Sequence, residues 1–182
     1  MVYAPFKKWN YRQRFIVMKY FSADYILPVS SQPIAHGIVA IDKEGIIQKI
    51  GTADTFGSVD VETHQGVILP GFINCHCHLE LSHMKGLCGT GTTLIPFIGD
   101  VVKHRDFDSD IILQKIKEED ENMFNAGIQA VGDICNKTDT AAQKSKSKMR
   151  YYSFIEMFDF LNAEMTLPTI ENYRTVFTFW TN

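Results

Sequence analysis

The chain has 182 residues, of which 45% are hydrophobic and 21% are charged, and its formal net charge at pH 7 is −3. These values are typical of a globular protein with a sizeable core, and they argue against a nucleic-acid-binding protein or one that binds anionic membranes. No stretch approaches the roughly 20 apolar residues that span a bilayer. The four cysteines are too few and too scattered for a disulfide framework, so we expect a cytoplasmic protein.

Residues 1–17 differ in composition from the rest of the chain. They include several basic residues and no acidic residue, and Met18 then begins a more ordinary sequence. We expect residues 1–17 to be a leader or a mis-assigned start. An organellar transit segment is the alternative, but the Ser-rich character of such segments is missing.

Residues 18–69 contain short apolar segments separated by turn residues. Ile38–Ile41 and Ile46–Ile50 flank the sequence Asp-Lys-Glu-Gly, which predicts a β-hairpin in which Gly45 takes a positive φ. The pattern predicts a small β-domain.

Two histidines follow a strand-like segment and a Pro-Gly turn within Val67–Ser82. In a strand, residues i and i+2 point to the same face, so His76 and His78 can bind one metal ion while Cys77 turns away. Cys75 and Cys77 are expected to be small buried apolar groups rather than ligands. The spacing predicts a site for one divalent metal ion, zinc or iron, that activates water.

Strand and helix patterns alternate after the histidine pair. Glycines in residues 84–108 favour a mobile connection over the site or an inert surface loop, with neither option preferred. The rest predicts a helix from an N-cap at Ser109 to Phe124, a strand over 128–134, a polar helix over 138–149, a strand over 151–157 and a helix over 168–180. Such alternation is typical of βαβ units around a parallel sheet.

The histidine segment resembles the amidohydrolase superfamily, in particular the branch that contains cytosine deaminase, guanine deaminase, chlorohydrolases and aminofutalosine deaminase. The first barrel strand of that branch typically reads Pro-Gly-Phe-x-(Asn/Asp)-x-His-x-His, and residues 70–78 match it position by position. Residues 45–51 also match the common phrase Gly-x-Ile-x-x-Ile-Gly. The resemblance implies an α/β fold, with a small β-sandwich over residues 18–69 followed over residues 70–182 by the first part of a (β/α)8 TIM barrel.

The resemblance also implies a metal-dependent hydrolase of non-peptide carbon–nitrogen bonds that deaminates an N-heterocyclic small molecule, such as a purine, a pyrimidine or an aminofutalosine-like compound. A complete barrel needs about 250 residues, so this chain is expected to be truncated after about three strand–helix units. The remaining ligands would lie beyond Asn182, and we assign no catalytic residue. The isolated chain should be inactive, and it should be either poorly soluble or dependent on another chain. A homo-oligomer is one possible state of the full-length form.

Two alternatives remain open. The chain can be a non-catalytic metal-binding or regulatory module that pairs with a separately encoded remainder. It can also belong to a binuclear hydrolase of cyclic amides, which would need a bridging lysine on a later strand. Nucleic acid and membranes are not expected as partners.

Several further residues have expected roles. Glu80 would return to the histidine face if the strand continued, and acids in that position contact substrate in several relatives, so we predict a substrate-binding role; the alternative is a solvated or helix-capping carboxylate. Asp133 is near the carboxyl end of the strand expected over 128–134, at the face where barrel active sites form, and we expect a loop or cap residue there rather than a residue of the site. The remaining histidines are expected at the surface and three aromatic residues in the core: His36, His64, His83 and His104, and Phe154, Phe158 and Phe160.

Overall fold

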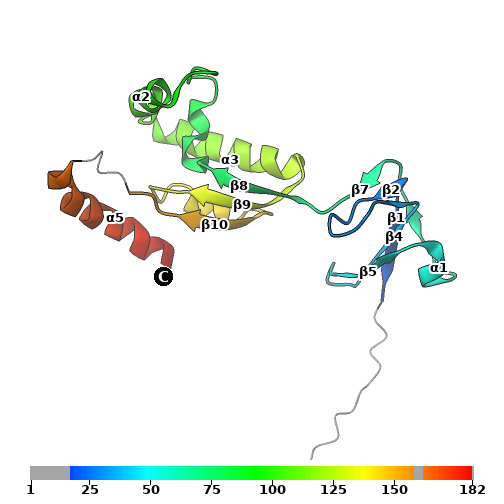
Figure 1. The fold of residues 1–182 in the computed structure, drawn as a ribbon. Coiled ribbons are helices and arrows are strands. Elements are labelled where there is room, and N and C mark those ends of the chain that lie inside the picture. The colour runs from blue at the N-terminus through cyan, green and yellow to red at the C-terminus, as the bar shows by residue number, and fades with distance from the viewer. Residues whose placement is uncertain (1–16, 158–161, 182) are drawn as a thin grey trace, which may run out of the picture. The chain divides into compact units, whose positions relative to one another are not determined.

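The structure, a computed structural model, describes residues 17–157 and 162–181. It divides into two compact units, which meet in sequence between Pro70 and Gly71 (Figure 1). In the described part of the chain, no helix combines the length and the apolar character needed to cross a membrane.

The first unit consists of short strands in two sheets. The larger sheet has the order β5-β4-β1-β6 and the smaller one the order β3-β2-β7. The strands are β1 (Lys19–Ser22), β2 (Tyr25–Ile26), β3 (Ile34–Ala35), β4 (Ile38–Ile41), β5 (Ile47–Gly51), β6 (Glu62–Thr63) and β7 (Val67–Ile68), with the short helix α1 (Ala53–Phe56). Ala23, Ile26 and Val39 form the buried cluster, and isoleucines from both sheets pack against it.

The expected hairpin is confirmed. Strands β4 and β5 pair antiparallel, and Gly45 has a φ of 81°, a region that glycine enters without steric cost. The carboxylate of Asp42 accepts hydrogen bonds from the backbone N–H groups of Glu44 and Ile46 at 3.0 and 2.9 Å. The turn is therefore stabilised by residues within four positions of each other.

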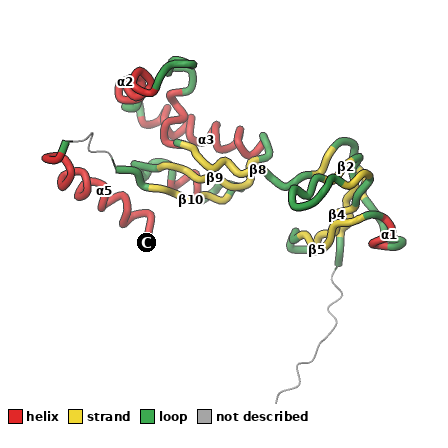
Figure 2. The backbone as a smooth tube through the Cα atoms, viewed as in Figure 1, coloured by secondary structure: helices red, strands yellow, loops and turns green. Residues whose placement is uncertain are grey.

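The second unit contains a three-stranded parallel sheet with the order β10-β9-β8 (Figure 2). The strands are β8 (Phe72–Cys77), β9 (Ile128–Ile134) and β10 (Arg150–Phe154). The helices are η1 (Leu79–Met84), α2 (Leu94–His104), α3 (Ser109–Asn125), α4 (Ala141–Lys144), η2 (Ala163–Met165) and α5 (Thr166–Thr181). The fold is mixed α/β, and the described strands do not close into a barrel.

Helix α3 covers one face of this sheet. Its buried residues recur every four positions, at Ile112, Ile116 and Asp120, as expected for an amphipathic helix. Ile112 and Ile116 pack with Leu79 of η1 in the core of the unit. The helix ends before Gly127, whose φ is 87°. Its N-cap is Asp108, one residue before the expected Ser109, because the Asp108 carboxylate accepts from the N–H groups of Asp110 and Ile111.

Several elements differ from their sequence expectations. The Gly-rich connection contains an eleven-residue helix, α2. The polar helix expected over 138–149 is reduced to four residues, because the segment after Lys144 turns to contact α3. Strand β10 ends at Phe154. Phe154 is 46% exposed rather than in the core, and Phe158 and Phe160 lie outside the described residues.

Candidate metal centre

His76 and His78 lie at the carboxyl end of β8, where that strand leads into η1. His76 is exposed and His78 is half-buried. Their ring centroids are 5.2 Å apart, with an angle of 70° between the ring planes. The two imidazoles are thus neighbours, as the His-x-His spacing predicts. Active sites of parallel α/β proteins form at this end of the strands.

A β-bulge interrupts β8 in the segment that contains His76. Asn74 pairs with Val131 and Cys77 pairs with Asp133, so two residues of β8 lie opposite the single residue Gly132. A Cβ atom on Gly132 would lie 2.8 Å from the carbonyl oxygen of Cys75, so this close approach requires glycine. The side chains of residues 74–77 therefore do not alternate between the two faces of the sheet as they would in a regular strand.

The bulge leaves Asn74 and Cys77 on the helix-covered side of the sheet. The amide nitrogen of Asn74 lies 3.7 Å from the sulfur of Met123 in α3, and Cys77 packs against the buried cluster around Leu79. Cys77 is therefore a half-buried side chain on the side of the sheet that α3 covers. Cys75, in contrast, is exposed, so the expectation that it is buried was wrong.

The ionisation of these groups suits a site built from neutral imidazoles. Burial and the nearby His76 lower the pKa of His78, which favours the neutral form that binds metals. Burial and the neighbouring Asp133 raise the pKa of the Cys77 thiol to about 12, which keeps it protonated.

Asp133 supports the end of β8 from the neighbouring strand. Its side chain is fully buried, and one carboxylate oxygen accepts a hydrogen bond of 2.8 Å from the backbone N–H of Leu79, the residue after His78. The other oxygen lies 2.6 Å from the ammonium nitrogen of Lys144. Asp133 is thus a strand residue and not a loop residue. Sequence reasoning missed Lys144 altogether, because its partner is eleven residues away in another element.

No protein-family model and no curated protein matches this chain in sequence. Solved structures do match the fold. Aminofutalosine deaminase from Helicobacter pylori, in complex with methylthio-coformycin, superposes with a TM-score of 0.67 at 18% identity, over 88% of this chain and 40% of the deaminase. Guanine deaminase from C. acetobutylicum, with bound guanine, gives 0.65 at 14% identity over 88% and 42% of the two chains. Zinc-complexed atrazine chlorohydrolase from Arthrobacter aurescens TC1 gives 0.56 at 18% identity, over 76% and 35%.

The chain has the fold of part of an amidohydrolase. These three structures are amidohydrolase-superfamily enzymes, so the sequence resemblance is confirmed at the level of fold. The chain spans about 40% of the length of the two deaminases. At identities of 14 to 18% the comparison carries the fold alone.

Glu80 lies in η1, because β8 ends at Cys77. Its carboxylate is buried and accepts hydrogen bonds of 2.7 and 3.0 Å from the backbone N–H groups of Asn136 and Lys137. Burial raises the pKa of Glu80, and the two backbone hydrogen bonds oppose that rise. In this structure the side chain therefore holds the segment after β9, and its contact with a substrate stays a prediction.

The other histidines lie apart from the pair. His36 and His64 are exposed, and His64 is 3.1 Å from Glu62. His83 is buried, with its Nε2 atom 3.3 Å from the carbonyl oxygen of His104, so the surface assignment of His83 was wrong. The apolar residues around it in sequence, Leu81 and Met84, were the available signal.

Whether a metal ion fits at His76 and His78 depends on the ligand atoms that the nearby side chains offer. Two neighbouring imidazoles, one of them with a lowered pKa, are suitable ligands for zinc or iron. Catalytic zinc generally has three protein ligands and an open position. Among the described residues, no group of three His, Cys, Asp or Glu side chains is placed to hold an ion. The pair thus fits part of a metal site.

Proposed function

We propose that this chain carries the first two metal ligands, His76 and His78, of a metal-dependent hydrolase. The enzyme would hydrolyse non-peptide carbon–nitrogen bonds and deaminate an N-heterocyclic small molecule such as a purine, a pyrimidine or an aminofutalosine-like compound. The observation that carries the proposal is the placement of both imidazoles 5.2 Å apart at the carboxyl end of a parallel strand. The deaminase and chlorohydrolase folds that it matches support the reaction class.

In such enzymes a bound divalent ion, zinc or iron, lowers the pKa of water. The residues of this chain contribute binding and orientation. His76 and His78 would hold the ion through ring nitrogens, and Cys77 would pack against the buried cluster around Leu79. We also propose that the first unit is a small β-sandwich and that the second unit is the first part of a TIM barrel. Glu80, at the start of η1, remains the proposed substrate contact.

The described residues supply only part of a metal-ligand set, so metal binding and catalytic turnover have different expected outcomes. Two histidines without a third described donor should bind an ion weakly, because each missing ligand lowers affinity. We therefore propose that the 182-residue chain by itself does not release ammonia. The same observation favours a second candidate, a non-catalytic metal-binding module that pairs with a separate polypeptide.

Metal binding by the purified chain tests the proposal. Zinc and iron are titrated into the wild type and into His76→Asn/His78→Asn, with His36→Asn/His64→Asn as a control that removes two exposed histidines of the first unit. We expect weak binding that the first double variant loses and the control keeps. Equal binding by all three proteins would contradict the proposed site.

Ammonia release from adenine, guanine, cytosine and aminofutalosine-type compounds is measured in the same preparations. We expect none from the isolated chain. If the chain binds metal tightly and stoichiometrically through the two histidines but releases no ammonia, the non-catalytic metal-binding module is favoured over an incomplete enzyme.

A further inference from the structure

A buried ion pair links all three parallel strands at their carboxyl ends. Asp133 of β9 contacts Leu79 after β8 and Lys144 of α4, and the Lys144 ammonium group donates to the hydroxyl oxygen of Ser153 in β10 at 2.9 Å. We propose that Asp133, held in place by Lys144, is a positioning residue for the two imidazoles. The inference rests on the proposed function, because it treats His76 and His78 as the groups that must be held.

The hydrogen bond from Leu79 acts directly on the metal-binding segment. The N–H of Leu79 belongs to the peptide group whose carbonyl is that of His78, so the 2.8 Å bond to Asp133 fixes the plane of that peptide. His78 has φ −124° and ψ 75°, outside the regular strand and helix regions. The local chain conformation alone does not favour this geometry. A buried charged acceptor, which forms stronger hydrogen bonds than a neutral one, stabilises it.

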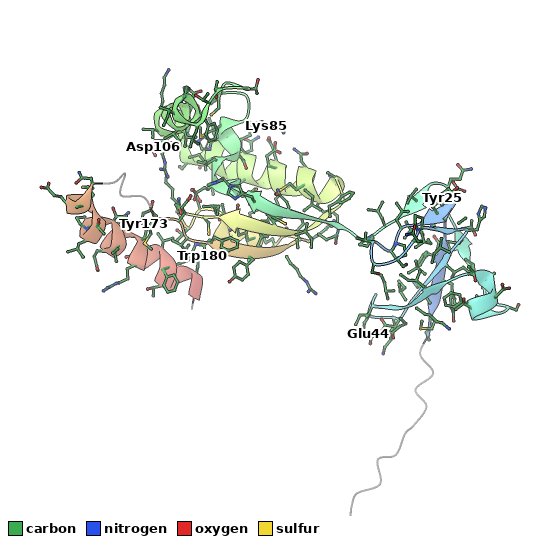
Figure 3. The ribbon with its side chains drawn as sticks, in the orientation of Figure 1. Tyr25, Glu44, Lys85, Asp106, Tyr173 and Trp180 are labelled. Atoms are coloured by element: carbon green, nitrogen blue, oxygen red, sulfur yellow. The ribbon has the colours of Figure 1, made fainter. Side chains whose placement is uncertain are left out.

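Lys144 pairs with the Asp133 carboxylate inside the unit and fixes its direction. The side chains of Lys144 and Asp133 are 5% and 0% exposed, so neither charge has enough solvent around it to be stable alone. The ammonium group lies 4.5 Å from the ring centroid of Trp180, which projects from α5 toward the sheet (Figure 3), and 5.4 Å from that of Tyr151. These aromatic faces add a favourable environment for the cation. The carboxylate of Asp133, the hydroxyl of Ser153 and two aromatic faces thus surround the Lys144 ammonium group.

The bulge supplies the second constraint on the same segment. Gly132, next to Asp133, allows the carbonyl of Cys75 to approach, and this approach starts the two-residue excursion of β8 that contains His76. Asp133 then holds the chain again just after His78. The backbone of residues 76–78 therefore lies, in sequence, between two contacts made by consecutive residues of β9.

Two neutral double variants of the full chain separate positioning from packing. Asp133→Asn/Lys144→Gln keeps an oxygen that can accept from Leu79, whereas Asp133→Leu/Lys144→Met keeps similar volume and removes the acceptor. Both avoid an unpaired buried charge. Asp120→Asn is the matched control, because Asp120 is a buried carboxylate that accepts from Tyr151, Ser147 and Gln143 but has no described hydrogen bond to β8.

Two readouts are used at a temperature at which circular dichroism shows every variant folded. The first is the nuclear Overhauser contact between the His76 and His78 rings in the metal-free chain, together with exchange of the Leu79 amide. The second is the zinc affinity. We expect the Leu/Met variant to lose the ring contact, to exchange Leu79 faster and to bind zinc 10 to 100 times more weakly, whereas the Asn/Gln variant and Asp120→Asn stay within about threefold of wild type.

The outcomes decide between the two proposals. An unchanged ring contact in the folded Leu/Met variant, or an equal loss in Asp120→Asn, would overturn the positioning role. If the wild type binds no zinc, the proposed function fails, and the ring contact alone then decides the role of Asp133. Should the Leu/Met variant not fold, Asp133→Val/Lys144→Met, which also lacks the acceptor, replaces it.

Discussion

The two units use buried carboxylates in different ways. In the first unit, Asp42 accepts from Glu44 and Ile46, within its own hairpin. In the second unit, Asp133 and Glu80 accept backbone N–H groups from residues more than 50 positions away. A local carboxylate stabilises a turn made of neighbouring residues, whereas a long-range carboxylate depends on the whole unit and fixes segments next to the histidine pair. The difference shows where the chain uses buried charge to specify geometry.

The largest expected effect comes from removing the carboxylate of Asp133, which leaves its buried partner Lys144 without a counter-ion. Asp133→Leu alone buries the Lys144 ammonium group without its counter-ion, and we expect a loss of about 3–5 kcal/mol in the free energy of unfolding of the second unit. Urea titration followed by amide exchange measures it. Amides of β4 in the first unit should keep their protection.

Adding Lys144→Met to that variant is the control, since it removes the unpaired charge and should restore most of the lost stability. A single variant as stable as the double one would show that the ion pair does not matter.

The bulge offers a smaller, steric test. Gly132→Ala places a Cβ atom 2.8 Å from the Cys75 carbonyl oxygen, and the required shift should cost about 1–3 kcal/mol. Gly99→Ala in α2 is the matched change, because its Cβ meets open space within a helix and alanine is the better helix former. Thermal unfolding should separate the two variants in opposite directions. A stable Gly132→Ala protein would contradict the close approach.

The local carboxylate gives a pH-dependent effect confined to the first unit. The backbone hydrogen bond from Ile46 is the main cause that lowers the pKa of Asp42 in the folded chain. A lowered folded pKa means that the ionised carboxylate adds stability above its ordinary pKa, near 4, and that this stability is lost as pH falls through the folded value. The stability difference between wild type and Asp42→Asn should be constant from pH 5 to 7 and shrink below about pH 4.

Exchange of the Ile46 amide at each pH reports this difference. A difference that persists unchanged at pH 3 would show that the charge of Asp42 has no part in it.

An exposed ion pair on α3 should contribute least to the free energy of unfolding. Lys117 and Glu121 on α3 are 4.0 Å apart, and both side chains are more than half exposed. Lys117→Ala should change the free energy of unfolding by less than about 0.5 kcal/mol, because solvent and salt screen such pairs. Chemical denaturation measures it, and a loss above 1 kcal/mol would show that distance from the core is a poor guide to charge energetics in this chain.

Sequence by itself determined the elements whose causes are local. The hairpin around Gly45, the strand Ile128–Ile134 and the adjacency of His76 and His78 each follow from a few neighbouring residues. Helix α3 was also predictable, apart from a one-residue shift of its cap, because its apolar repeat and its stop lie within one segment.

Only the tertiary structure decided the environment of the histidine pair. The bulge depends on Gly132 in another strand, the buried ion pair joins β9 to α4, and Glu80 is buried by the segment that follows β9. The expected helix over 138–149 also shortened, because Ser147 bonds to Asp120 across the unit. Such contacts join residues that are distant in the chain, and the energy of a buried charge depends on partners that no local pattern shows.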